Sequence, residues 1–462
     1  MTARHTAGRQ ESTMAKGPAR FLLVDYNLSR IEDVRRIRDY ADRAYGAPVT
    51  LVRARPTGAD RLICDEVIDL DPLRPDFVEA GEKLLGARRA EFAAGVVFSD
   101  NAVRGGAELL RRLGLAVDSP ELAEGAFCKL AYRRAEDGVR EQLAAQRVMV
   151  PGFAEISSME DLRAFARRHP DGFVVKPTKE GNNRGVVLVR FGDDLGAAFE
   201  EVRPYLADGV ICEQIIPYDR EYSYDGLGHL RFVTEKLSAV GRYPVEYAQV
   251  LPARVTEAGL ASVERAGRQA NVLVGQCDGP FHNEIKLSDD DRYAAVVEPN
   301  RRPAGMKIWS LAHWVYGIDL YHAWVDAAFG ADTPGSLPEP TCSAATVMLG
   351  VTSDQLFDPD GLRPGATPFE DALSATAAAL GLGAGELAAR DFTWLVTERR
   401  LLHAVPRDNA DFAAQGCLTL HTDRVDVRDV VGALREAWPA ALHASRLDGP
   451  PRRDPATEPK AR

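Results

Sequence analysis

The chain is 462 residues long, has 57 basic and 68 acidic side chains and carries a formal net charge of −11. A negative surface of this kind repels nucleic acid, and no run approaches the roughly 20 apolar residues that a membrane span needs. We therefore expect neither nucleic acid nor a membrane as a partner. The six cysteines are scattered without a metal-binding spacing, which favours reduced thiols in a cytoplasmic protein over zinc.

The two ends of the chain differ from the rest in composition. Residues 1–18 hold charged and small polar side chains without the apolar core of a secretory signal, so we expect a flexible leader. Residues 447–462 are rich in Pro, Arg, Asp and Glu, a composition typical of a disordered tail. The length between these ends predicts about three domains.

Apolar runs and amphipathic segments alternate along residues 19–122. The short apolar runs predict strands, and the longer segments between them predict helices. This order predicts a parallel sheet with helices on both faces, as in a Rossmann-like domain. No G-x-G-x-x-G sequence opens the first helix, so a dinucleotide is not supported. The expected strands are 20–25, 48–53, 66–70 and 95–99, and the expected helices are 30–45, 76–90 with Asp76 as its N-cap, and 102–113.

From residue 123 onward the pattern predicts further mixed α/β structure without an internal repeat. A charged helical segment comes first, and a strongly apolar helix lies after the strand pair at 283–300. We expect helices at 123–143, 159–168, 257–273 and 309–329, strands at 172–176, 185–190 and 209–214, several β-prone runs within 221–251, and a further α/β unit at 342–441.

Residues 282–305 read as two short strands around a polar turn, and the second strand ends in Glu298-Pro-Asn300. Residues two apart on a strand share a face, so Glu298 and Asn300 point the same way. Glu284 joins that face if the strands pair antiparallel. Two carboxylates and an amide oxygen are hard donors that suit Mg²⁺, and the alternative is a surface hairpin with solvated charges.

Two arginines follow this strand end directly, Arg301 and Arg302, and Pro303 and Gly305 come next. An arginine beside a metal site is well placed to bind a substrate carboxylate through two parallel hydrogen bonds. The segment therefore predicts a substrate contact beside the metal.

A strand at 173–176 passes into a polar loop that contains glycine, residues 179–185. Lys176 at the end of the strand can place a point charge on a phosphate, and the loop can cover phosphates with its backbone N–H groups. The loop is not a P-loop, because G-x-x-x-x-G-K-[ST] does not occur. The alternative is a plain β-hairpin turn.

Two further patterns fit a nucleotide. Residues 213–216 can read an adenine edge through backbone groups while Glu221 bonds a ribose hydroxyl, and the alternative is an exposed linker. Lys129 and Arg133 lie one turn apart on a predicted helix, so they form a cationic face that is either functional or solvated.

The order of these residues resembles that of an ATP-grasp enzyme over residues 20–440. The runs HNEIKL and VEPNRRPAG are most similar to the carboxylate–amine ligase branch, which includes L-amino acid ligases. The resemblance implies ATP as co-substrate and Mg²⁺, or Mn²⁺, as metal. It implies phosphate contacts from Lys129, Lys176 and a lid loop with Gly181, Arg184 and Gly185, an adenine site at Glu213, Gln214, Ile215 and Ile216, a ribose contact from Glu221, metal ligands Glu284, Glu298 and Asn300, and Arg302 on the acyl phosphate or substrate carboxylate, with Arg302 and Lys176 as catalytic residues.

The implied fold class is mixed α/β, a two-lobed ATP-grasp fold behind the Rossmann-like domain. The small lobe covers 123–216, the central lobe with the metal site covers 217–335, and a C-terminal α/β lid subdomain covers 336–446. The family run reads Glu-x-Asn-Pro-Arg-x-Gly-Gly, whereas this chain has Arg301 and Ala304 in place of the proline and one glycine. Neither departure removes a metal ligand, but both alter the substrate side.

The resemblance implies a ligase that activates a carboxylate, expected to be an amino acid, as an acyl phosphate and joins it to an amine, releasing ADP and phosphate. A role in peptide or secondary-metabolite biosynthesis, such as that of an antibiotic, follows. Two alternatives stay open: transfer of the amino acid to the phosphopantetheine thiol of a carrier protein, and a nucleotide-binding protein without turnover. The expected partners are small-molecule carboxylate and amine substrates, with a carrier protein and a homodimer as further options.

Overall fold

The computed structural model describes residues 19–447, and the predicted leader and all but the first residue of the predicted tail lie outside them. By its internal contacts the chain divides into two compact units. Within the described residues, the first contains 19–120 and Trp324–Thr333, and the second contains Glu121–Ala323 and 334–447. None of the described helices combines the length and hydropathy of a membrane span. All six cysteines lie within the described residues and are free thiols.

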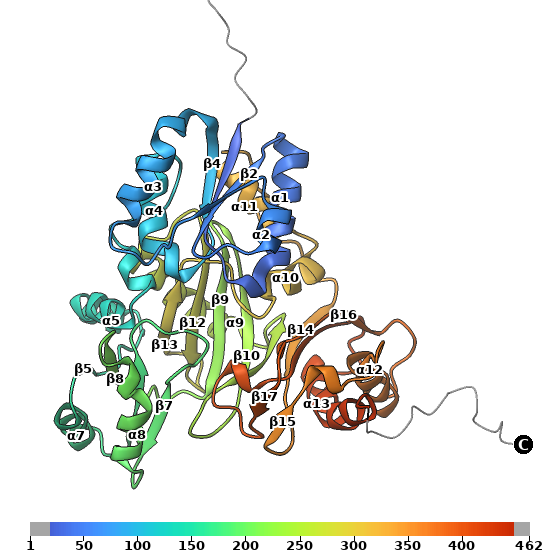
Figure 1. Cartoon of the computed structure of the whole chain (residues 1–462). Helices are drawn as coiled ribbons and strands as arrows, with labels where there is room; N and C mark the ends of the chain where they lie inside the picture. Colours follow the sequence, from blue (N-terminus) through green and yellow to red (C-terminus); the bar gives the residue numbers. More distant parts are fainter. Residues whose placement is uncertain (1–18, 448–462) are drawn as a thin grey trace, which may run out of the picture. The chain divides into compact units, whose positions relative to one another are not determined.

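The first unit is built on a four-stranded parallel sheet in the order β3-β2-β1-β4, as the alternation of apolar runs predicted. Helices lie on both sides of this sheet (Figure 1). Its strands are β1 (Arg20–Val24), β2 (Val49–Arg53), β3 (Glu66–Asp69) and β4 (Phe92–Val97), and its helices are α1 (Ile31–Tyr45), α2 (Gly58–Ile63), α3 (Phe77–Leu85) and α4 (Val103–Arg112). The segment Trp324–Thr333 packs into this unit as well, where Phe329 stacks on Tyr45 with ring centroids 4.0 Å apart.

Residues 153–214 of the second unit contain an antiparallel four-stranded sheet in the order β5-β8-β6-β7. Two helices, α7 and α8, bury Leu162, Phe165 and Ala198 against it. The elements are β5 (Phe153–Ile156), α7 (Met159–Arg168), β6 (Gly172–Pro177), β7 (Val187–Arg190), α8 (Leu195–Val202) and β8 (Val210–Gln214). β5 is a strand that the sequence reading missed.

The other large sheet of this unit has eight strands in the order β13-β12-β9-β10-β11-β14-β18-β16. Strands from the predicted central lobe and the predicted C-terminal subdomain therefore share one sheet, joined where β11 pairs with β14. Helix α9 packs on β12 and β13, and α12 and α13 cover the C-terminal strands. The elements are β9 (Arg220–Leu227), β10 (Leu230–Ser238), β11 (Glu246–Leu251), α9 (Glu257–Leu273), β12 (Pro280–Leu287), β13 (Ala294–Asn300), β14 (Ser343–Leu349), α12 (Pro368–Ala379), β16 (Leu387–Trp394), β18 (Ala414–Leu420) and α13 (Val427–Ala444), with a separate hairpin of β15 (Gln355–Phe357) and β17 (Arg400–Leu402).

Three predicted helices are wrong in extent. The segment 123–143 is broken into a 3-10 turn and two helices, α5 (Lys129–Gly138) and α6 (Arg140–Ala145). The apolar segment 309–329 divides into α10 (Ile308–Tyr316) and α11 (Leu320–Ala328), because Gly317 ends α10 in the left-handed region with φ +73°.

The segment 76–90 is helical only to Leu85 and continues as a 3-10 turn from Gly86. Asp76 stands at the N-cap position, but its side chain makes no cap hydrogen bond and pairs with Arg74 instead. Composition alone did not show these breaks, since each interrupted segment keeps helix-forming residues on both sides.

Candidate active site

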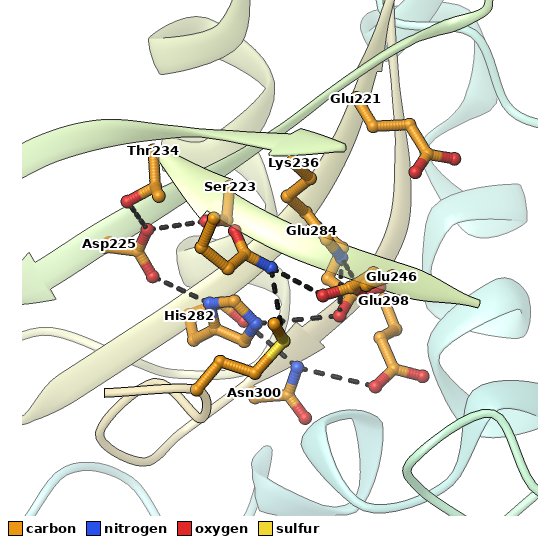
Figure 2. Close-up of polar contacts among 12 residues, drawn as sticks. Glu221, Ser223, Asp225, Thr234, Lys236, Glu246, His282, Glu284, Glu298 and Asn300 are labelled. Carbon is orange, nitrogen blue, oxygen red and sulfur yellow. Dashed lines mark hydrogen bonds and ion pairs between the residues drawn. The ribbon is translucent and has the colours of Figure 1, made fainter. Parts of the chain in front are cut away.

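The predicted strand pair at residues 280–300 is present as β12 and β13, which run antiparallel. Glu284 lies opposite Glu298, and His282 lies opposite Asn300, so all four side chains share one face of the sheet. Figure 2 shows Glu284, Glu298 and Asn300 converging there, next to Lys236 from β10. The structure therefore brings together the three predicted metal ligands.

Two lysines, the half-buried Lys129 and the buried Lys236, neutralise the two carboxylates of this face. Lys129 Nζ lies 2.8 Å from a Glu298 oxygen, and Lys236 Nζ lies 2.9 Å from a Glu284 oxygen. Burial alone would raise the pKa of Glu298, but Lys129 holds that pKa below its ordinary value. The carboxyl groups are thus charged acceptors in a sheltered site, and the alternative of a solvated surface hairpin is wrong.

Behind Glu284 lies a carboxylate–imidazole pair that the sequence reading did not find. Asp225 Oδ1 is 2.6 Å from His282 Nδ1, and its other oxygen accepts hydrogen bonds from Ser223 and Thr234. Burial opposes charge on His282, yet Asp225 raises the pKa of the imidazole to about 9. Its Nε2 is 3.5 Å from Glu284 Oε1, so the charged ring supports this carboxylate.

A further acidic residue, Glu246 on β11, also pairs with Lys236 (Figure 2). Its carboxylate also accepts a hydrogen bond of 2.5 Å from Gln249 Nε2. Burial and the nearby Glu284 raise the pKa of Glu246, while Lys236 opposes that shift. Lys236 lies on β10, and Glu246 lies on β11, which pairs with it. No sequence motif predicts that this lysine and this carboxylate come together.

Residues 284, 298 and 300 fit a hard divalent cation. Two carboxylates that stay charged, with an amide oxygen beside them, form the donor set that Mg²⁺ and Mn²⁺ accept together with phosphate and water. Lys129 contacts Glu298 and Lys236 contacts Glu284, so the negative charge of the two carboxylates is already balanced in part by the protein.

Lys176 lies at the end of β6, buried beside Glu213 on β8. The Lys176 Nζ to Glu213 Oε2 distance is 2.9 Å, and Arg133 binds the same carboxylate. Burial would raise the pKa of Glu213, but Arg133 and Lys176 lower it to about 2. Lys129 and Arg133 have side chains only 14% and 1% exposed, so the alternative of a solvated cationic face is wrong.

The loop at 179–185 connects β6 to β7 and turns through residues in the left-handed region. Asn182, Asn183 and Gly185 have φ of 59°, 60° and 69°. The exposed Arg184 pairs with Glu180 at 3.3 Å, and Gly181 is exposed too. Lys129 Nζ donates to the carbonyl of Glu180 at 2.7 Å, so the lysine that pairs with Glu298 also contacts this loop.

The segment proposed for adenine, residues 213–216, begins on β8 and continues past its end. The Gln214 N–H donates to the carbonyl of Gly152 at 2.7 Å, while Ile216 is buried. Glu221 on β9 is 2.9 Å from Lys286 and accepts a hydrogen bond from Ser238. The side chains of Gln214 and Glu221 therefore have partners within the protein.

Arg301 and Arg302 have different surroundings. The buried Arg301 donates to Gln276 at 3.0 Å and to the carbonyl of Val274 at 3.1 Å, beyond the end of α9. Arg302 is half-buried and lies 3.5 Å from Asn300 Oδ1, on the metal side. The structure thus brings Arg302, and not Arg301, to the three metal-ligand candidates.

Comparisons with known proteins agree with this geometry in fold. The L-amino acid ligase of Bacillus licheniformis superimposes with a TM-score of 0.68 at 15% identity, covering 91% of this chain and 97% of that chain. N5-carboxyaminoimidazole synthetase of Staphylococcus aureus, complexed with ADP, gives 0.60 at 15% identity over 90% and 97%. The fold is mixed α/β and has ATP-grasp proteins as its structural neighbours.

Comparison of the sequence with known proteins finds two kinds of related enzyme. Alanine–anticapsin ligase of Bacillus amyloliquefaciens is 25% identical over 272 residues, which are 53% of this chain and 56% of that relative. Formate-dependent phosphoribosylglycinamide formyltransferase of Corynebacterium efficiens is 28% identical over 235 residues, 47% and 56% of the two chains. The match thus spans little more than half the length of these relatives, and no protein-family profile matches. The chain is related to the ATP-grasp carboxylate–amine ligases.

Proposed function

We propose that this protein is an ATP- and Mg²⁺-dependent ligase that joins the carboxylate of an amino acid to an amine through an acyl phosphate. The observation that carries the proposal is the shared face of β12 and β13, where Glu284, Glu298 and Asn300 meet with Lys129 2.8 Å from Glu298. Such a site suits the phosphates of a nucleotide with a divalent cation. The amino-acid substrate is suggested by the relatives named as ligases of amino acids.

Positioning and charge neutralisation supply most of the acceleration in phosphoryl transfer. Glu284, Glu298 and Asn300 would hold Mg²⁺, which would neutralise the phosphate oxygens. Lys129 and Lys176 place their ammonium groups on the phosphates, and the substrate carboxylate attacks the γ-phosphorus. The bond from that phosphorus to the bridging oxygen breaks, and ADP leaves.

Arg302 and the loop at 179–185 act in the second half of the reaction. Arg302 holds the acyl phosphate while the amine attacks its carbonyl carbon and phosphate leaves. The loop must exclude water during this interval, because water would hydrolyse the mixed anhydride. Residues 213–216 hold adenine and Glu221 holds ribose.

A thiol acceptor on a carrier protein is the second candidate, and it shares every step up to the acyl phosphate. The two candidates are separated by one screen. Purified protein is incubated with Mg²⁺-ATP and single amino acids or pairs of them, with a phosphopantetheinylated carrier protein in a parallel arm. We expect phosphate release together with a dipeptide or amide. A carrier-bound aminoacyl group would instead favour the thiol acceptor, and nucleotide binding without product in any arm would contradict ligase activity.

A further inference from the structure

Arg133, which the mechanism above does not use, is the most deeply buried cation of this site. It lies on α5, one turn after Lys129, and only 1% of its side chain is exposed. Its guanidinium grips Glu213 with two parallel hydrogen bonds, Nε to Oε1 at 3.0 Å and Nη2 to Oε2 at 3.1 Å. Nη1 donates to Glu136 at 2.5 Å.

A fourth contact ties Arg133 to the metal-binding strand. Its Nη2 also donates to the carbonyl of Val297 on β13 at 3.0 Å. Val297 is the residue directly before Glu298, so this bond fixes the backbone beside a metal-ligand candidate. One side chain therefore reaches both β8 of the four-stranded sheet and β13 of the eight-stranded sheet.

Through Glu213, Arg133 also reaches the phosphate-binding lysine. Glu213 Oε2 is 2.9 Å from Lys176 Nζ. Because Arg133 fixes both oxygens of Glu213, Lys176 meets this carboxylate in one defined orientation. An ammonium has three donors, so Lys176 can still donate hydrogen bonds to other acceptors. Arg133 pairs with both Glu213 and Glu136, whereas Lys176 pairs with Glu213, so the loss of Arg133 would remove the ion pair of Glu136 and leave Glu213 with Lys176.

We propose that Arg133 is a positioning residue of the nucleotide site, which orients the Lys176 ammonium through Glu213. This inference rests on the proposed function, because it assigns Lys176 to the phosphates of ATP. A lysine at position 133 keeps the charge but lacks the planar fork, so it cannot hold both Glu213 oxygens and the Val297 carbonyl at once.

The test is a double-mutant cycle on nucleotide affinity. Mg²⁺-ATP is titrated into wild type, Arg133→Lys, Lys176→Met and the double variant, and the thermal transition of each is recorded. If Arg133 acts through Lys176, Arg133→Lys weakens ATP binding by roughly 10-fold or more in the wild-type background and by less than about 3-fold in the Lys176→Met background. Arg134→Lys is the matched control, because the neighbouring Arg134 is 64% exposed and pairs with Glu155; its affinity should equal that of wild type.

Each outcome decides a separate point. Failure of wild type to bind ATP would overturn the proposed function. Binding by wild type with equal affinity in Arg133→Lys, or with the same loss in both backgrounds, would overturn the role of Arg133 alone. If Arg133→Lys does not fold, Glu213→Gln takes its place in the same cycle. The amide keeps the shape of the side chain but removes the charge that orients Lys176, and an equal loss in both backgrounds would again overturn the inference.

Discussion

Arg301 and Arg302 are adjacent in the chain, yet their guanidinium groups serve different parts of the structure. Arg301 is buried against Gln276 and Val274, and Arg302 faces Asn300. If Arg302 holds the acyl phosphate, Arg302→Lys should lower kcat/KM. The corresponding loss of transition-state stabilisation should be about 2–4 kcal/mol, the range for losing one preorganised donor to developing charge. Steady-state kinetics with the substrate found in the screen measure this effect, and ATP affinity should survive.

Arg301→Ala is the comparison for that variant. It removes a buried group that donates to Gln276 and to the carbonyl of Val274 and leaves these acceptors unsatisfied, so we expect a loss of about 1–3 kcal/mol in the free energy of unfolding. Its catalytic effect should be milder than that of Arg302→Lys at temperatures where the variant is folded. A larger loss of kcat/KM in Arg301→Ala would show that the substrate contact is assigned to the wrong arginine.

Glu298 offers the sharpest test of the metal site. Glu298→Gln preserves size but removes the charge that a divalent cation needs, so ATP turnover should fall by roughly 100-fold or more while the thermal transition stays near that of wild type. The matched control is Asp289→Asn, an exposed acid in the turn of the same hairpin, which should keep full activity. Turnover at the wild-type level in Glu298→Gln would remove this residue from the metal site.

Because the pKa of Lys176 is lowered, we expect the affinity for ATP to depend on pH. Burial lowers the pKa of Lys176 below its ordinary value of 10.5, and Arg133 and Lys129 lower it further, although Glu213 opposes them. The charged form binds phosphate, so affinity is present at low pH and is lost as the pH rises through a value below 10.5. Titration of ATP binding from neutral to alkaline pH measures this loss. In Lys176→Arg the guanidinium stays charged, and an unchanged alkaline loss there would assign it to another group.

At the residue scale, the sequence predicted which side chains lie together only where these residues are close in the chain. Glu298, Asn300 and Arg302 are two residues apart from one to the next, and residues at this spacing on a strand point to the same face. Asp225, Lys236 and Glu246 were missed. Each lies on a strand whose partners in the sheet could not be ordered from the sequence, so nothing indicated that they face Glu284 and His282.

At the scale of elements, the loop at 179–185 yields a matched pair of glycine variants. Gly185 has φ +69°, and an added Cβ would lie 2.8 Å from Tyr205 and 2.9 Å from Pro177. Gly185→Ala should therefore cost about 1–2 kcal/mol of backbone strain in a left-handed conformation and raise the KM for ATP. Gly181→Ala meets no atom within 4 Å and has no such φ, so its KM should be that of wild type. Equal KM values in both variants would separate the shape of this loop from ATP binding.

Period-two alternation predicted the hairpin of β12 and β13 well, because its strands are joined by a short turn. The helix breaks were harder. Lys129 begins a new helix at α5, where its N–H donates to the carbonyl of Thr178 at 2.8 Å, a tertiary contact that no local pattern announces. The short strand β5 was missed because four residues carry too little alternation to distinguish a strand from a loop.

At the scale of the whole molecule, the mixed α/β class was predicted correctly from the alternation of elements. The shared eight-stranded sheet was not, since β11 pairs with β14 across a connection that contains α9, the hairpin and two further helices. The predicted boundary at residue 335 falls within that connection, so it separates segments whose strands belong to one sheet. Pairings between strands so far apart in the chain leave no trace in local hydrophobic periodicity.

The measurement that tests the central claim most directly is the fate of ATP and of a labelled carboxylate, followed together by phosphorus NMR. The protein is incubated with Mg²⁺-ATP, an amino acid labelled with oxygen-18 in its carboxylate, and the acceptor from the screen. We predict ADP and inorganic phosphate in equal amounts, only when the carboxylate is present, with one labelled oxygen carried into the phosphate. AMP with pyrophosphate, or phosphate without the label, would contradict activation as an acyl phosphate.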